Sequence, residues 1–150
     1  MHTAGLLLYL STVASATPLM RTEGIASLAD GTPAYREVHW RRGAPEGAQR
    51  WVQYLCPDRR PFARKELPGT AQPLARGYLL QDGRSGQAAR VVVAGTQVSI
   101  DWKESAAEAE RQARVPLPAD AVIDTGFDAA VRAHWPALMK GEQVQLPFLV

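Results

Sequence analysis

Cysteine is almost absent from this 150-residue chain: Cys56 is the single one, so the sequence cannot form an internal disulfide. A chain without disulfides must rely on its hydrophobic core for stability. The sequence also lacks charge blocks and low-complexity tracts, and its 46% content of hydrophobic residues is ordinary for a globular protein. These absences favour one ordered domain with a modest core.

Nucleotide-binding signatures are also missing. The sequence has neither the G-x-x-x-x-G-K phosphate loop nor a G-x-G-x-x-G turn after a strand. The stretch Gly83, Arg84, Ser85, Gly86 lacks the G-x-S-x-G spacing of a nucleophile elbow and is typical of a turn. We therefore predict neither nucleotide binding nor an α/β-hydrolase site.

Histidine is scarce as well, with three in the chain. His2 belongs to the N-terminal segment discussed next, which leaves His39 and His134, and we expect Cys56 to be buried as a small hydrophobic residue. A zinc site needs three or four protein ligands. We predict no metal site and no cofactor.

The N-terminus carries the pattern of a cleaved signal peptide. Residues 4–16 form an uncharged, mostly apolar run that ends in Ala14, Ser15 and Ala16, the small residues that signal peptidase accepts. The run is shorter than the roughly 20 residues of a membrane-spanning helix. We expect cleavage after Ala16, a single mature domain over 17–150, a periplasmic or secreted location and no stable transmembrane span. Because the first three residues include no Lys or Arg, a buried N-terminal helix or an uncleaved anchor is the alternative.

The net charge is only +2, but it is unevenly spread. Eight basic residues face three acidic ones over 36–65, whereas seven acids face three bases over 101–128. A basic zone attracts anionic lipid headgroups, glycans or nucleic acid. Arg41–Arg42 and Arg59–Arg60 are instead typical of exposed turns, and aromatic residues are not interleaved with the arginines as in a nucleic-acid platform. We predict no nucleic-acid partner.

Most of the chain has the period-two alternation of short strands separated by turns. Val98, Ile100 and Trp102 alternate with polar residues in the clearest example. Residues 104–114 lack an apolar stripe, and we expect a polar excursion there. The predicted strands cover 24–29, 34–40, 50–56, 62–67, 76–81, 89–94, 97–102 and 143–150.

One amphipathic helix is expected over 126–139. Thr125 would cap it together with Asp128 in a capping box, and Pro136 predicts a kink or an early end. The buried stripe would consist of Phe127, Val131, Trp135 and Leu138. An antiparallel sheet with one wet face needs a cover on its dry face. We therefore predict an α+β fold, a curved antiparallel β-meander of seven or eight strands packed on one C-terminal helix.

The best candidate for chemistry is the pair Glu37 and His39, which project from one face of a strand. A carboxylate beside an imidazole can share a proton and act as a general base. Lys65, Asp82 and Arg84 are the candidates to join them. The alternative is a structural pairing of Glu37 with a cationic side chain on the neighbouring strand.

The tryptophans are the candidates for ligand binding. Trp40, Trp51 and Trp102 lie in predicted strands, and Trp135 lies in the helix. Core packing is their ordinary role, and the alternative is a cleft that binds a lipid or a glycan.

Five stretches together resemble a loosely defined group of exported bacterial proteins that has no established activity: Tyr35 to His39, Phe62 to Lys65, Asp82 to Gly86, Asp124 to Trp135, and Gly141 to Val150. The resemblance implies a chain that continues beyond Val150, and an apolar strand at the end of the sequence agrees with truncation. The order of elements is also similar, by analogy alone, to periplasmic lipoprotein carriers, whose curved sheet wraps a helix around an apolar cavity.

Two functional hypotheses follow. The first is a non-enzymatic envelope or periplasmic module that holds an apolar or lipid-like ligand between sheet and helix, in a cavity lined by tryptophans. The second is a metal-dependent or hydrolytic enzyme centred on Glu37 and His39, with Lys65, Asp82 or Arg84 converging on them. A purely structural envelope role requires neither feature, and the sequence predicts no particular oligomeric state.

Overall fold

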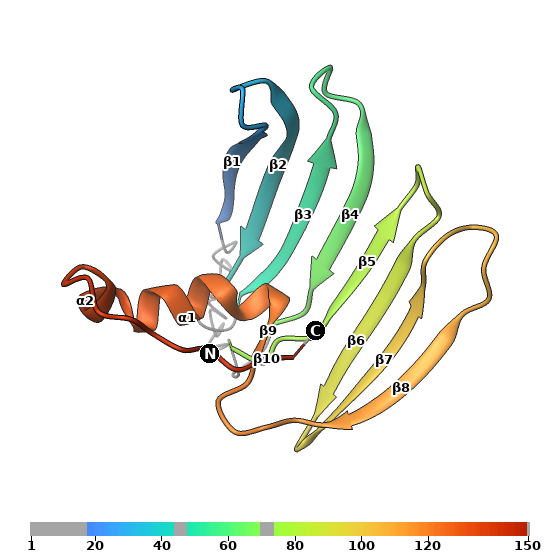
Figure 1. Ribbon diagram of the computed structural model, residues 1–150. Coiled ribbons are helices and arrows are strands. Elements are labelled where there is room, and N and C mark those ends of the chain that lie inside the picture. The colour runs from blue at the N-terminus through green and yellow to red at the C-terminus, as the bar shows by residue number, and fades with distance from the viewer. Residues whose placement is uncertain (1–17, 44–47, 70–73, 150) are drawn as a thin grey trace, which may run out of the picture.

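The main feature of the computed structural model, which describes residues 18–43, 48–69 and 74–149, is a single large antiparallel sheet (Figure 1). Its eight strands lie side by side in chain order, each antiparallel to the next. The expected signal peptide lies outside the described residues. The strands are β1 (Leu19–Ser27), β2 (Pro33–Arg42), β3 (Gln49–Leu55), β4 (Pro61–Leu67), β5 (Tyr78–Asp82), β6 (Ala88–Ala94), β7 (Gln97–Lys103) and β8 (Arg111–Pro116).

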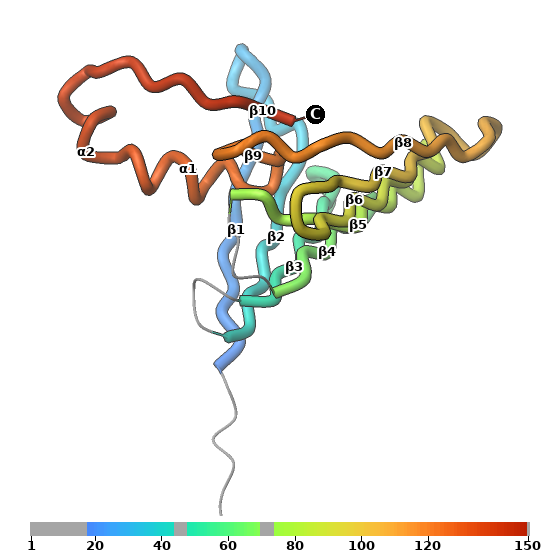
Figure 2. Tube along the Cα trace, turned by 90° about the horizontal axis from the view of Figure 1, so that it is seen from below, coloured from blue at the N-terminus to red at the C-terminus, as the bar shows by residue number. Residues whose placement is uncertain are grey.

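A second, small layer follows the sheet in the chain. It consists of β9 (Val122–Ile123), the 3₁₀ turn η1 (Asp124–Gly126), α1 (Phe127–Ala133), α2 (Trp135–Leu138) and β10 (Phe148–Leu149). β10 pairs with β9 in parallel. Seen along the strands, the sheet curves from β1 to β8, with β9, β10 and α1 on its concave side (Figure 2). This confirms the predicted α+β meander with a C-terminal helix.

The hydrophobic core lies between the concave face of β5–β8 and the small second layer. Val91 of β6, Val98 of β7 and Ile123 of β9 are its buried centre, and Leu117 and Leu149 pack against them. Val98 belongs to the alternating set, with Ile100 and Trp102, that the sequence assigns to one face of its strand. The period-two pattern therefore identifies the face that is buried.

Hydrogen bonds hold η1 and the end of β9 against the segment that precedes β5. The Ile123 amide donates to the carbonyl of Leu74 at 3.0 Å, and the Thr125 hydroxyl donates to the carbonyl of Arg76 at 2.7 Å. Arg76, only 2% exposed, donates in turn to the carbonyl of Ala48 at 2.9 Å. These bonds fix where α1 begins relative to the sheet.

One strand forms where the sequence analysis expects a polar excursion. Residues 111–116, which begin inside the expected excursion over 104–114, form β8 and pair with β7. Ala113 and Val115 lie opposite Ile100 and Val98, so two small apolar side chains extend the buried face. Without β8, the backbone groups on the outer side of β7 would be unpaired. β8 is the edge strand of the sheet, and its arginines make that edge charged.

The helix agrees with its prediction in one respect and differs from it in two. It breaks at His134, and Pro136 lies in the first turn of α2, which confirms the expected interruption. Thr125 does not cap the helix, because its hydroxyl bonds to Arg76. The predicted buried stripe is wrong: Ala130 is fully buried, whereas Phe127, Trp135 and Leu138 are 49%, 55% and 37% exposed.

The position of the helix explains this error. α1 crosses the sheet near one end of β2–β4, and α2 extends past β1, where no strand lies beneath it (Figures 1 and 2). A helical period shows which side chains share a face, but that face is buried only where another element covers it. The expected strand over 143–150 is also shorter, with only Phe148–Leu149 paired among its described residues.

No helix among the described residues is both long and apolar enough to cross a membrane.

Candidate functional site

A cavity of about 350 Å³ lies between the concave face of β2–β4 and the segment that runs through η1 into α1. Its wall contains both ionisable and apolar side chains, contributed by the sheet, by η1 and α1, and by β10. We call it the sheet–helix cavity. It is lined by Glu37, His39, Arg50, Val52, Tyr54, Lys65, Leu67, Asp124, Thr125, Phe127, Asp128 and Phe148.

Glu37 and His39 lie side by side in this cavity, as their spacing on β2 predicts. The Nε2 atom of His39 is 2.9 Å from Oε2 of Glu37. The His39 side chain is 45% exposed and the Glu37 side chain is 30% exposed, so the pair is accessible to a solute that enters the cavity. The arrangement can hold one proton between an imidazole and a carboxylate, which is the element of a general base.

Lys65 also reaches the cavity, which agrees with one of the expected partners. Its ammonium nitrogen is 2.5 Å from Oδ2 of Asp124 and 5.0 Å from the ring centre of Tyr78. The Lys65 side chain is only 15% exposed. This ion pair joins β4 to η1, and it leaves the Lys65 charge largely compensated.

Tyr54 is the titratable side chain of the cavity with the clearest shift. Burial, followed by the nearby negative charges of Glu37 and Asp124, raises the pKa of Tyr54 to about 12. Both effects disfavour the phenolate. At neutral pH Tyr54 is therefore a hydrogen-bonding hydroxyl on the cavity floor.

The Tyr54 shift predicts a loss of stability at high pH. In the unfolded chain a tyrosine ionises near pH 10, whereas Tyr54 in the folded chain holds its proton to about pH 12. Between these values the unfolded state binds fewer protons, so the free energy of unfolding falls as pH rises. Chemical denaturation at pH 8 to 11.5 should show a shallower fall for Tyr54→Phe than for the wild type. Equal slopes would contradict the assignment.

Asp82 and Arg84 do not join Glu37 and His39. Arg84 pairs with Asp82 at 3.2 Å, and its guanidinium lies over the Phe62 ring, 3.4 Å from the ring centre. The Asp82 carboxylate also accepts from the amides of Arg84 and Ser85. Partial burial raises the pKa of Asp82, but the hydrogen bonds from Arg84 and Ser85 outweigh it, so the pKa is lowered. These residues fasten the turn between β5 and β6.

None of the four tryptophans lines the sheet–helix cavity, although Trp40 lines the neighbouring cavity described below. Trp40 and Trp51 lie opposite each other on β2 and β3, and the guanidinium of Arg21 lies 5.7 Å from the Trp40 ring centre. Trp102 lies far along the sheet on β7, and Trp135 is 55% exposed on α2. The structure does not bring the four together.

Two phenylalanines supply the aromatic wall instead. The rings of Phe127 on α1 and Phe148 on β10 lie 5.9 Å apart, and both residues line the cavity. They are 49% and 47% exposed. An exposed pair of large rings at a cavity is unusual for core residues and typical of a contact surface. The helical period predicts Phe127 in the buried stripe, and no local pattern distinguishes a core phenylalanine from one at a contact surface.

A second cavity, of about 380 Å³, adjoins the first and shares His39, Arg50 and Asp128 with it. Two of its lining residues, Met20 and Thr22, lie on β1, the edge strand of the sheet. We call it the arginine cavity, because three of its lining residues are arginines. It is lined by Met20, Thr22, His39, Trp40, Arg41, Arg50, Asp128 and Arg132.

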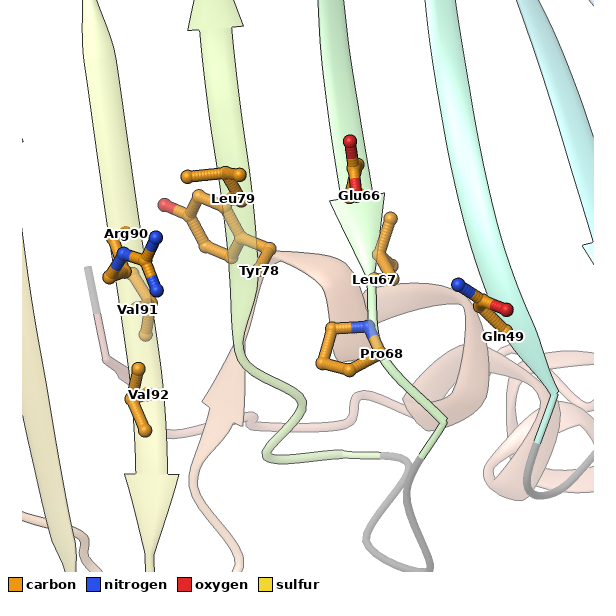
Figure 3. Close-up of a pocket in the computed structure, with 9 residues that line it drawn as sticks. All are labelled: Gln49, Glu66, Leu67, Pro68, Tyr78, Leu79, Arg90, Val91 and Val92. Carbon is orange, nitrogen blue, oxygen red and sulfur yellow. The ribbon is translucent and has the colours of Figure 1, made fainter.

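A third hollow, of about 200 Å³, lies at one end of β4–β6 and carries no set of cooperating groups (Figure 3). The side chains of its charged residues, Glu66 and Arg90, are separated by those of Tyr78 and Leu79 (Figure 3). Glu66 is paired with Arg64 at 3.0 Å. We therefore place the candidate site at the two adjoining cavities beside α1.

Within the described ranges, no three His, Cys, Asp or Glu side chains come together in a way that could hold a metal ion. Comparison of the chain with protein-family models, with curated proteins and with solved structures found no match. The two resemblances seen in the sequence therefore stay predictions.

Proposed function

We propose that this protein is an exported binding module that holds a small amphiphilic molecule between its curved sheet and its helix. The observation that carries the proposal is the composition of the sheet–helix cavity. Phe127 and Phe148 give it an exposed aromatic wall, while Glu37, His39 and Tyr54 present polar groups from the sheet. Ligand pockets generally combine apolar walls with a few convergent polar groups.

The size of the cavity limits what it can hold. Its volume of about 350 Å³ is at the lower end of the roughly 300–1,000 Å³ typical of ligand sites. That suits a small molecule or one end of a longer one. The mixed wall favours a ligand with an apolar part and a polar end over a fully apolar one.

The proposed location follows from residues 4–16 and the small residues that end at Ala16. In the periplasm or outside the cell, amphiphiles released from the envelope would be the molecules available to such a module. The proposal concerns binding and does not require a reaction.

A fluorescence titration tests this function. The probe is a dansyl-labelled undecanoate added to the protein at neutral pH. We expect saturable binding of one probe per chain, accompanied by a blue shift of dansyl emission. Unlabelled decanoate should displace the probe. Emission that rises linearly with probe concentration and is not displaced would contradict a defined site.

A second candidate function is hydrolysis, favoured by the 2.9 Å contact between His39 and Glu37 inside the cavity. In this case His39 would take a proton from water, the oxygen would attack an ester carbonyl, and the leaving alcohol would accept a proton. Removing a general base typically lowers the rate by about 10²–10⁴. His39→Gln should therefore abolish hydrolysis of p-nitrophenyl butyrate, whereas His134→Gln, at the exposed break between α1 and α2, should retain it. Equal rates in both variants would exclude this function.

A further inference from the structure

Arg50 lies at the boundary between the two cavities and lines both. Its Nε atom is buried without a hydrogen-bond partner, and within the described residues no carboxylate lies within ion-pair distance of its guanidinium. Most cations at partly buried positions are paired. Arg50 therefore keeps its hydrogen-bonding capacity for a group outside the described chain.

Two further arginines face the same space. Arg132 reaches the arginine cavity from α1 and Arg41 reaches it from β2. Within the described part of the chain, Arg41 donates only to the sulfur of Met20, at 2.9 Å, and a thioether sulfur is a weak acceptor. The one acidic residue of the lining is Asp128, so three guanidinium groups face a single carboxylate.

The electrostatics of Arg50 agree with an excess of positive charge. Burial, and then the neighbouring charge of Arg132, lower the pKa of Arg50, while Asp128 opposes them and Arg41 adds to them. An anion at this position would relieve the repulsion between the arginines. The planar guanidinium fork matches carboxylate and phosphate oxygens in bidentate geometry.

We infer that the arginine cavity is an oxyanion subsite, in which Arg50 and Arg132 bind the phosphate or carboxylate end of the ligand. The inference rests on the proposed function, because the anionic end would lie here while the apolar part extends into the sheet–helix cavity toward Phe127 and Phe148. The shared lining residues His39, Arg50 and Asp128 make the two cavities continuous neighbours. The ligand class is thus an anionic amphiphile with a single compact head.

The test compares two probes that share a tail and differ in the head: decyl phosphate and the uncharged decyl glucoside. Their binding is measured by calorimetry to the wild type, Arg50→Gln, Arg132→Gln and the control Arg64→Gln. Arg64 lies on the convex face in an ion pair with Glu66. A charge-assisted hydrogen bond contributes enough for about a 10-fold change or more. Arg50→Gln and Arg132→Gln should weaken decyl phosphate binding by at least that factor, and weaken decyl glucoside binding by a clearly smaller factor.

Arg132 is exposed on α1, so Arg132→Gln is expected to fold even if Arg50→Gln does not. Wild-type affinity of Arg132→Gln for decyl phosphate, or an equal loss in Arg64→Gln, would overturn the subsite. Failure of both probes to bind the wild type would instead overturn the proposed function. Titration with inorganic phosphate alone distinguishes a free anion from a lipid-like headgroup as the ligand of this subsite. Affinity equal to that of decyl phosphate indicates a free anion, and much weaker affinity indicates a lipid-like headgroup.

Discussion

Replacing Gly126 by alanine should lower the free energy of unfolding by more than about 2 kcal/mol, because the new Cβ has no room. A Cβ at this position would overlap the backbone carbonyl of Leu74. That carbonyl accepts the hydrogen bond from the Ile123 amide at 3.0 Å, so it cannot move without breaking the contact that places η1. Urea denaturation followed by circular dichroism measures the change.

Gly24→Ala is the matched control for this substitution. Gly24 lies in β1, and no atom lies within 4 Å of the place where its Cβ would be. We expect its free energy of unfolding to stay within about 0.5 kcal/mol of the wild type. Similar urea midpoints for Gly126→Ala and Gly24→Ala would contradict the close approach of η1 to Leu74.

Replacing Phe127 by serine should weaken binding of the dansyl undecanoate probe by about 10-fold or more. Covering a phenylalanine side chain with an apolar ligand contributes about 1.5–3 kcal/mol, which corresponds to roughly 10- to 100-fold in affinity. Because Phe127 is already 49% exposed in the folded chain, the substitution should disturb stability much less than binding. Titration of the purified variant measures the loss.

Trp135→Ser is the control for Phe127→Ser. Trp135 is similarly exposed, at 55%, and belongs to the same C-terminal helical region, but it does not line the sheet–helix cavity. Its substitution should leave probe affinity within about twofold. If both substitutions weaken binding equally, the probe is held by exposed aromatic surface in general and not by the cavity.

The sheet could be predicted from the sequence because its signal is local. Alternation of apolar and polar residues identifies the strands and their buried faces, and it correctly places Glu37 and His39 side by side. β8 was missed since Ala113 and Val115 form too short an alternation to stand out within a polar segment. Pairing with β7 supplies what the local pattern lacks.

The candidate site could be predicted only in part, because most of it depends on contacts between distant segments. Lys65 meets Asp124 across 59 residues of sequence, and no motif announces such a pair. Arg50 and Arg132 come together only because α1 crosses the ends of β2 and β3. For the same reason, the sequence does not show which tryptophans line a cavity or which face of the helix is buried. Residue type and period identify a face, and the packing of elements decides whether that face is covered.

Native mass spectrometry of the protein purified from the periplasm of its own cells, before and after extraction with organic solvent, would show directly whether the two cavities hold a ligand. We expect a chain that begins at Thr17 and carries a bound anionic amphiphile, which extraction removes and added decyl phosphate replaces. A chain that carries no such molecule and takes up no decyl phosphate would contradict the claim that the space beneath α1 is a ligand site.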